Sequence, residues 1–180
     1  MRVPARQSGT PPRISGGRNM TFTVSSLTSA GSYFEDFDVG SVLRHARGKT
    51  VTPLENVLIT NLVMNSAQGH FNEDVMAKSS FGKILVYGGV NFSMVLGLAT
   101  QDCCENALAE VGLDNIQLLR PVGHGDTLYA VSEILSKEDS AQPDAGYVVF
   151  RHSGYNQNEE LVAKVDRRAL IKRKSHWGNR

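Results

Sequence analysis

A single histidine and a later pair of glycines are the residues whose types and spacing could do chemistry together. His70 lies in the polar stretch "NSAQGHFNEDVMAKSSFGKILVYGG", which covers residues 65–89 and ends in Gly88 and Gly89. Imidazole in general titrates close to neutral pH, so a histidine can take a proton from water and give one back. Glycine lets a backbone turn sharply or approach a ligand closely. A lone histidine in a loop is more often a solvated or capping residue, so the surrounding sequence must decide.

Two helices are predicted around this stretch. The segment "PLENVLITNLVMNSA" starts with Pro53, a favourable first helical position. Its residues at helical spacing, which form a partial apolar stripe, are Leu54, Val57, Leu58, Asn61 and Leu62. The segment "GVNFSMVLGLATQDCCENALAEVG" is the longest apolar one and has helical length. One face of this helix carries Phe92, Val95, Leu96, Ala99 and Cys103. Ser93, Gly97 and Thr100 are small enough to let it pack closely against a sheet.

The remaining elements are predicted to be strands. The segment "SYFEDFDVGSVLRHARGKTVT" indicates an opening turn and then a strand up to Thr52. In the second half, "LDNIQLLRPV", "DTLYAVSEILSKE", "GYVVFRHSGYNQ" and "ELVAKVDRRALIKRK" are strand-like and separated by turn-forming residues. Consecutive strands joined by short turns pair antiparallel. One long apolar helix followed by such a sheet predicts an α+β domain in which a curved antiparallel sheet wraps the helix.

Composition limits the classes of protein to consider. A chain of 180 residues with 41% hydrophobic residues can form one domain with a sizeable core. The net charge of +1 does not indicate a nucleic-acid-binding protein. No apolar run reaches the roughly 18 residues that a membrane span needs. The two cysteines, Cys103 and Cys104, are adjacent, so no disulfide framework is expected and a reducing compartment, the cytoplasm, is predicted.

Four motifs in order resemble those of MaoC-type dehydratases, a branch of the hot-dog fold. The first is the stretch that contains His70, with its Phe-Gly pair, apolar strand and glycine. The second is "LLRPVGHGDTL", similar to a Pro-Val-x-x-Gly-Asp-Thr-Leu turn between strands. The third is "NQNEELV", with Glu159 where the family usually has glycine, and the fourth is the ending "RRALIKRK". Together they cover residues 33–174.

One departure from that family separates this chain from most MaoC-type proteins. The usual motif is Asp-x-Asn-Pro-x-His, whereas this chain reads Asn65-Ser66-Ala67-Gln68-Gly69-His70. An amide cannot take up a proton as a carboxylate does, so a mechanism with aspartate and histidine as twin bases is not open to this chain. The asparagine form resembles the subgroup that acts on mesaconyl-CoA, itaconyl-CoA and related branched dicarboxylyl thioesters.

The resemblance implies hydration of an enoyl-CoA or dehydration of a 3-hydroxyacyl-CoA. His70 would deprotonate the attacking water and supply a proton to the α-carbon, and Asn65 would orient that water. Backbone N–H groups at the helix that begins with Gly88 and Gly89 would stabilise the charge on the thioester oxygen. The neighbouring Tyr87 and Ser93 are the other candidate binding residues. No metal and no cofactor are expected, because coenzyme A is part of the substrate.

Three alternatives stay open: an (R)-specific hydratase of linear short-chain enoyl-CoA, a hot-dog thioesterase, and a non-catalytic acyl-CoA-binding module. A thioesterase would need a carboxylate near the helix, and Asp102 is far along it. A dicarboxylyl substrate needs a cationic partner, for which the sequence offers Arg44, Arg47, Lys49, Arg120 and Arg151.

The resemblance also sets the expected organisation and assembly of the chain. We expect residues 1–31 to form a flexible arm, residues 32–175 one hot-dog domain, and residues 176–180 a short tail. An exposed edge strand is a liability that proteins usually cover. Hot-dog relatives build the acyl-CoA tunnel between two subunits, so we expect a homodimer or a dimer of dimers, with no nucleic-acid or membrane partner.

Overall fold

Helix α3 (Gly88–Cys103) runs through the middle of the protein, and the core lies between it and the surrounding sheet. The computed structural model describes residues 22–24 and 31–178. Val90, Val95 and Ala99 are buried at intervals of five and four residues, which places them on one face of the helix. The helix ends at the C-cap residue Cys104, whose N–H donates to the Thr100 carbonyl.

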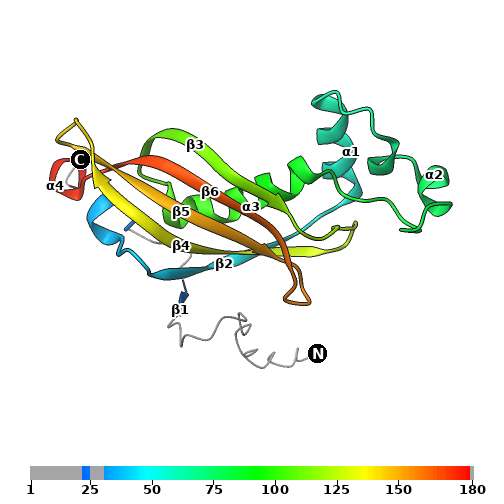
Figure 1. Cartoon of the computed structure of the whole chain (residues 1–180), viewed down its shortest axis with the longest axis horizontal. Helices are drawn as coiled ribbons and strands as arrows, with labels where there is room; N and C mark the ends of the chain where they lie inside the picture. Colours follow the sequence, from blue (N-terminus) through cyan, green and yellow to red (C-terminus); the bar gives the residue numbers. More distant parts are fainter. Residues whose placement is uncertain (1–21, 25–30, 179–180) are drawn as a thin grey trace, which may run out of the picture.

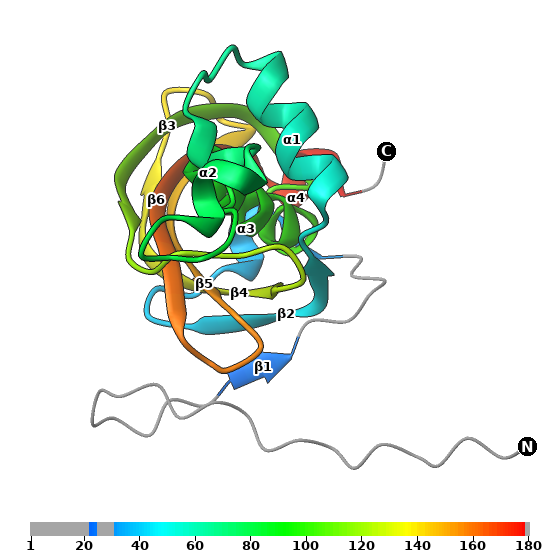
Figure 2. The same cartoon turned by 90° about the vertical axis from the view of Figure 1, so that its right-hand side faces the viewer.

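The sheet that surrounds α3 has six described strands in the order β1-β2-β4-β5-β6-β3. Their bounds are β1 (Phe22–Val24), β2 (Val42–Thr50), β3 (Ala107–Leu118), β4 (Thr127–Asp139), β5 (Ala145–Tyr155) and β6 (Leu161–Lys172). All neighbours pair antiparallel except β1, which pairs parallel with β2. Figures 1 and 2 show the sheet curving around α3. The predicted α+β architecture, a long helix wrapped by a curved antiparallel sheet, is confirmed.

The core divides into two clusters, one toward each end of α3. In β5, buried residues alternate with less buried ones, so one face of the strand lies on the helix. The cluster toward the start of α3 includes Val86, Val90, Val95, Val122 and Leu128. The cluster toward its end includes Phe34, Phe37, Cys103, Ile134 and Phe150. The short helices η1 (Phe34–Asp36) and α4 (Lys174–Trp177) lie at this second end.

The connection between β2 and α3, residues 51–87, is called the overhang below. It contains α1 (Pro53–Leu62), η2 (Gln68–His70) and α2 (Glu73–Ala77). Figure 1 shows α1 and α2 beyond one end of the sheet, next to the start of α3. Thr52 and Glu55 form a capping box at the start of α1, in which the Thr52 N–H donates to Glu55 Oε2 at 2.8 Å.

Two expectations about which helix faces are buried were wrong. In α1 the apolar stripe faces outward, with Leu54, Leu58 and Leu62 exposed by 73%, 51% and 71%, while the polar Asn56 and Thr60 are buried. In α3, Ser93 and Gly97 are exposed, so these small residues do not face the sheet. Only the third small residue, Thr100, makes a contact toward the sheet, accepting from Arg167 Nη1 on β6 at 3.3 Å. Periodicity identified both helices and the buried side of α3, where Val95, Ala99 and Cys103 are buried, but not the buried side of α1.

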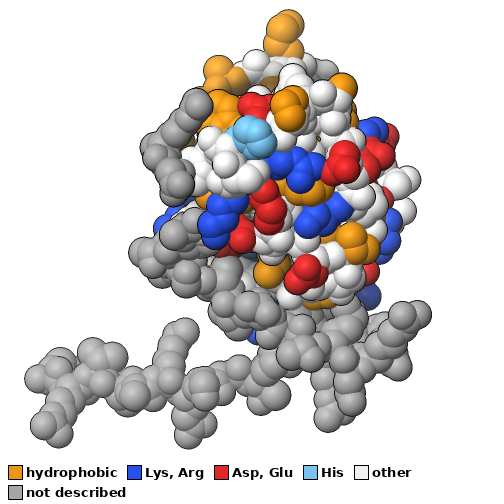
Figure 3. Space-filling view, turned by 90° about the vertical axis from the view of Figure 1, so that its left-hand side faces the viewer, with side chains coloured by type: hydrophobic (Ala, Val, Ile, Leu, Met, Phe, Trp, Pro, Cys, Tyr) orange, Lys and Arg blue, Asp and Glu red, His pale blue; other side chains and the backbone are white. Residues whose placement is uncertain are grey.

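The predicted arm and tail are described only in part. Residues 1–21, 25–30 and 179–180 lie outside the described residues, while β1 falls within the predicted arm and α4 overlaps the predicted tail. Within the described part of the chain, no helix is long and apolar enough to cross a membrane. The face drawn in Figure 3 mixes basic and acidic side chains and has no continuous patch of either sign.

The departure from the family's turn motif has a conformational consequence. Glu159 lies between β5 and β6 and has a φ of 64°. That left-handed region suits glycine, which the family usually has at this position, and strains a residue with a side chain.

Candidate active site

His70 ends the short helix η2, and its side chain is half-buried. Its Nδ1 lies 2.9 Å from the carbonyl oxygen of Leu85. A carbonyl only accepts, so Nδ1 carries the proton and Nε2 of the neutral ring keeps a free lone pair. No hydrogen-bond partner of Nε2 is found among residues 22–24 and 31–178. The fold therefore holds this histidine in the tautomer that can accept a proton at Nε2.

The start of α3 lies next to this ring. The ring of Tyr87, the N-cap residue of α3, is 5.5 Å from the His70 ring, centroid to centroid. Tyr87 makes no side-chain capping hydrogen bond. Its carbonyl accepts from the N–H groups of Val90 and Asn91, and among the described residues nothing accepts from those of Gly88 and Gly89. Two backbone donors at the positive end of the helix dipole are thus left for a ligand.

A side chain at either glycine would meet neighbouring side chains of the same chain. A Cβ atom on Gly88 would lie 2.2 Å from Leu118 Cδ1, and one on Gly89 would lie 2.4 Å from Tyr87 Cε1. The space above each glycine, which we expected to admit a thioester, is taken by these side chains in the single chain. Any anion-binding role therefore depends on the N–H groups and not on the missing side chains.

Among the described residues, neither Asn65 nor Ser93 makes a hydrogen bond to the side chain of His70. Asn65 Oδ1 accepts from the N–H of Ala67 at 2.9 Å, which forms a tight turn toward His70. One lone pair of Oδ1 is thus used, and the second lone pair and Nδ2 are left to bind a ligand or water. Ser93 is exposed on the outward face of α3.

Two residues beside the site were missed from the sequence. Asn56 is fully buried on α1, and its Nδ2 donates to the His70 carbonyl at 2.8 Å and to His124 Nε2 at 2.9 Å. Its Oδ1 accepts from the N–H of Tyr87 at 2.9 Å. His124 is therefore bonded into the surroundings of His70. The burial of Asn56 is visible only in the structure, because α1 also has other polar residues, among them Thr60 and Asn61.

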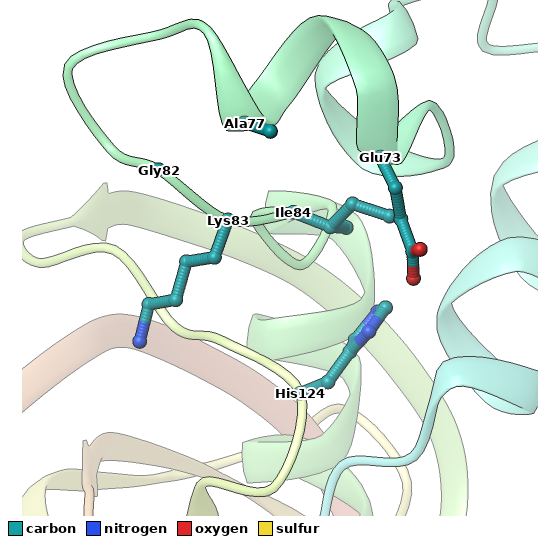
Figure 4. A pocket seen from close by; sticks show the side chains of 6 residues that line it. All are labelled: Glu73, Ala77, Gly82, Lys83, Ile84 and His124. Carbon is teal, nitrogen blue, oxygen red and sulfur yellow. The ribbon is translucent and has the colours of Figure 1, made fainter.

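A hollow of about 330 Å³ lies beside these residues, between the overhang and the turn that holds His124. It is lined by Glu73, Ala77, Gly82, Lys83, Ile84 and His124. In Figure 4 the side chains of Glu73 and His124 approach each other across this space, whereas Lys83 extends away from both. The hollow thus offers a polar wall next to the candidate base.

A second polar cluster lies at the other end of α3 and is closed to solvent. Asp102 Oδ2 lies 2.6 Å from His45 Nδ1, His45 Nε2 lies 2.6 Å from Ser132 Oγ, and Ser132 Oγ lies 2.6 Å from His152 Nδ1. Burial lowers the pKa of His45, although the hydrogen bond from its ring to Asp102 opposes this shift. Burial also lowers the pKa of His152, to about 3.

These pKa shifts and the acceptor character of Asp102 decide where the protons lie. Neutral His45 donates from Nδ1 to the carboxylate, so its Nε2 accepts from the Ser132 hydroxyl. The Ser132 oxygen then accepts from His152 Nδ1, which leaves a lone pair at His152 Nε2. That nitrogen is buried and has no partner among the described residues.

The same cluster holds the residues that could bind a metal ion. The ligand atoms of His45, Cys103 and His152 lie within 4.8 Å of one another, and all three residues are buried. Ser132 Oγ already pairs with both rings, and burial raises the pKa of the Cys103 thiol, which disfavours the thiolate that binds metals. His152 Nε2 has no partner among the described residues, but the protonated thiol and the use of both rings by Ser132 do not make a metal site, so we assign no ion to these residues.

Most of the cations considered for a substrate carboxylate are paired within the chain. Arg151 Nε lies 2.7 Å from Asp166 Oδ1, Arg120 lies 3.4 Å from Glu160, and Lys49 pairs with Glu55. Within the described ranges, Arg44 and Arg47 of β2 have no such carboxylate partner.

Comparison with known proteins gives the family and the fold. A family model described as mesaconyl-CoA hydratase matches residues 25–173. The mesaconyl-CoA hydratase of Haloarcula marismortui is 34% identical over 161 residues, which cover 82% of this chain and 44% of that protein. The chain thus spans less than half the length of that relative.

Two solved structures have a similar fold. A putative MaoC domain protein dehydratase from Chloroflexus aurantiacus superposes with a TM-score of 0.74 at 30% identity, over 80% of this chain and 46% of that one. A Mycobacterium tuberculosis protein with a double hot-dog fold gives a TM-score of 0.74 at 22% identity, over 82% of this chain and 46% of that one. The predicted hot-dog fold is confirmed by these likenesses.

Proposed function

The chain belongs to the mesaconyl-CoA hydratase family, and we propose that it is a hydro-lyase that adds water across the double bond of a short, branched dicarboxylyl-CoA thioester such as mesaconyl-CoA. The observation that carries this proposal is the hydrogen bond from His70 Nδ1 to the Leu85 carbonyl, which leaves Nε2 as a proton acceptor beside the start of α3. Coenzyme A belongs to the substrate, and we propose no metal or further cofactor.

The proposed reaction moves one proton through His70. Nε2 takes a proton from water while the water oxygen forms a bond to the β-carbon of the enoyl group. The electron pair of the double bond moves toward the thioester oxygen, and the proton on Nε2 is then delivered to the α-carbon. Asn65 orients the attacking water through Nδ2, which donates a hydrogen bond to it, while Oδ1 accepts from the Ala67 N–H.

The thioester oxygen needs donors while its charge develops. The N–H groups of Gly88 and Gly89 begin a helix of 16 residues and have no hydrogen-bond acceptor among the described residues. A pre-positioned donor of this kind stabilises a transition state by roughly 3 kcal/mol. Tyr87 borders the same place, and we keep it and Ser93 as substrate-binding candidates.

We propose that the active assembly is a homodimer, or a dimer of dimers, in the cytoplasm. β3 lies at an edge of the sheet, pairs only with β6, and exposes Leu108, Val111 and Ile116. Covering this edge with a second hot-dog unit is supported by the similarity to a double hot-dog chain of about twice the length. Both cysteines are free and buried, which suits a reducing compartment.

Light scattering at micromolar concentration tests the assembly. We expect twice or four times the chain mass of 19.6 kDa, with more than about 1,200 Å² buried in total between chains. An active monomer contradicts the proposed assembly.

The activity is tested by adding the protein to mesaconyl-CoA and crotonyl-CoA, and following enoyl absorbance and free thiol separately. Hydration removes the conjugated absorbance without releasing thiol, and we expect it to be faster with mesaconyl-CoA. Preference for crotonyl-CoA would indicate a hydratase of linear substrates. Thiol release would indicate a thioesterase, a role for which Asp102 is badly placed because it is bonded to His45. Binding without either change would indicate an acyl-CoA-binding module.

A further inference from the structure

The side chain of Asn56 joins three parts of the candidate site from inside the protein. It is 0% exposed and contacts the His70 carbonyl, the Tyr87 N–H and the His124 ring, at 2.8, 2.9 and 2.9 Å. A carbonyl only accepts and a backbone N–H only donates, so Oδ1 must face Tyr87 and Nδ2 must face His70. The second Nδ2 hydrogen then points to His124 Nε2, and the proton of neutral His124 lies on Nδ1.

The segments that Asn56 joins are the two that form the candidate site. The His70 ring is bonded to the Leu85 carbonyl at 2.9 Å, and the Leu85 N–H is bonded to the Gly69 carbonyl at 3.1 Å. Both bonds join η2 to Leu85 in the segment that precedes α3, but neither involves a residue of the helix or its N-cap. Asn56 adds the bond to Tyr87, the N-cap residue. It therefore fixes the backbone of His70 relative to the first turn of α3.

The orientation of α1 shows that this contact is favoured over apolar burial. The helix has an apolar stripe of Leu54, Leu58 and Leu62, and turning it inward would bury three leucine side chains. Removing these apolar side chains from water would stabilise the fold. Instead α1 turns Asn56 and Thr60 inward, and Thr60 Oγ1 finds no partner among the described residues. The inward side of α1 packs the partly buried Ile59 against the core but leaves three leucines exposed, and what it gains in their place is the three bonds of Asn56.

We propose that Asn56 is a positioning residue: it sets His70 and the Gly88–Gly89 amides at a fixed distance and couples His124 to both. It touches no substrate, because it is completely buried. The inference deepens the proposed function and rests on it. Displacing a reacting group by about 1 Å can slow a reaction by about 100-fold. We therefore expect the position of Asn56 to affect kcat more than KM.

Asn56→Asp is the sharpest test because it preserves size and changes only the hydrogen bonds. The carboxylate still accepts from Tyr87 but can no longer donate to the His70 carbonyl, which it repels. We expect kcat per folded molecule with mesaconyl-CoA to fall by about 10- to 100-fold, with KM changed by less than about threefold. Asn61→Ala is the matched control, since Asn61 lies on the same helix and is exposed. Its kcat and KM should equal those of the parent.

A second readout does not depend on activity. Histidine ring nitrogen shifts measured by NMR report which nitrogen carries the proton. In the parent, His70 and His124 should both be Nδ1–H tautomers, as their partners require. In Asn56→Asp, His124 should change to a ring that donates from Nε2 to the carboxylate, and His70 should lose its single tautomer.

The two readouts separate the two claims. A folded Asn56→Asp protein with parental kcat overturns the positioning role, and so do unchanged tautomers of His70 and His124. If the parent hydrates none of the thioesters, the proposed function fails. The tautomer changes then still decide whether Asn56 positions His70. If Asn56→Asp does not fold, Asn56→Ser, which is smaller and neutral, takes its place with the same expectations for kcat and for His70.

Discussion

The two ends of helix α3 both hold hydrogen-bonded histidines, yet they differ in what those histidines are free to do. At the start of the helix, His70 is half-buried, donates from Nδ1 to Leu85, and leaves Nε2 open. At the other end, roughly 24 Å away for a helix of this length, His45 and His152 share the hydroxyl of Ser132 and are 2% and 0% exposed. The free acceptor at the start of the helix, His70 Nε2, can be reached by a ligand. The free acceptor at the other end, His152 Nε2, is buried and cannot.

The difference shows that burial and the surroundings of the other ring nitrogen decide what each histidine can do. The hydrogen bond at Nδ1 does not distinguish them. In both places Nδ1 is held by an oxygen of the protein. Burial lowers the pKa of His45 and His152, so they stay neutral and serve as hydrogen-bond partners inside the core. We call the start of α3, with His70, the open end, and the other end, with His45, Ser132 and His152, the closed end. We therefore expect substitutions at the open end to alter catalysis and substitutions at the closed end to alter stability.

Removing the two imidazoles one at a time gives the largest contrast. His70→Ala should lower kcat by at least about 100-fold, because a general base is lost, while the melting temperature stays close to that of the parent. His152→Ala is the matched control at the closed end. It should lower the melting temperature and leave kcat per folded molecule unchanged. Near-normal turnover in a folded His70→Ala protein would remove His70 from the mechanism.

Removing the shared hydroxyl at the closed end should have the next largest effect. Ser132→Ala leaves His45 Nε2 and the N–H of His152 Nδ1 unpaired in the core. Leaving buried polar groups unpaired should cost about 2 kcal/mol of the free energy of unfolding. Urea denaturation measures this loss, and Ser136→Ala, an exposed site on the same strand, is the control. A loss below about 0.5 kcal/mol would mean that the cluster does not stabilise the fold.

The open end could be predicted from the sequence because its residues are close together along the chain. His70 and the Gly88–Gly89 pair lie in one stretch of 25 residues, and their spacing matches a family motif. The closed end could not, because its residues meet only through strand register. Ser132 lies opposite His152 in the β4–β5 pair and opposite Leu43 in the β2–β4 pair, and no local pattern encodes these partners.

Asn56 was missed for a different physical reason. Its helix exposes an apolar stripe, so the usual rule that apolar residues face inward assigned the wrong side to the interior. The rule holds for a helix that completes its packing within one chain. The exposed leucines of α1 and the exposed apolar residues of β3 therefore mark the part of the fold that the sequence of a single chain predicts least well.

The pH dependence of stability should also come from the closed end. In the unfolded chain His152 takes up a proton near its ordinary pKa of 6.5, but in the folded chain its pKa is lowered to about 3 by burial. The unfolded state binds more protons between these values, so stability is complete above about pH 6.5 and is lost as the pH falls toward 3. One such group changes the free energy of unfolding by up to about 1.4 kcal/mol per pH unit.

Denaturation between pH 6.5 and 5 isolates this contribution, because carboxyl groups in the unfolded chain titrate lower. We expect His152→Gln to reduce the slope of stability against pH, whereas His176→Gln on the exposed face of α4 should not. An unchanged slope in His152→Gln would show that the core histidine does not cause the acid sensitivity. His45, whose pKa is lowered in the same direction, should account for part of the slope that remains.

The smallest expected effect is at Asn65, which tests whether the open end needs a second polar group beside His70. Asn65 Oδ1 accepts from the Ala67 N–H, and Nδ2 is the side chain's donor for the attacking water. Asn65→Asp keeps the turn and loses that donor, so kcat should fall by about fivefold, the value of one hydrogen bond. Asn65→Ala loses the turn as well and should fall by about 10-fold, with little change in stability because the site lies at the surface. The Asp variant should also add an ionisation to the pH profile of kcat. If Asn65→Ala turns over mesaconyl-CoA as fast as the parent and the Asn61→Ala control, water at the open end is oriented by His70 and the backbone alone.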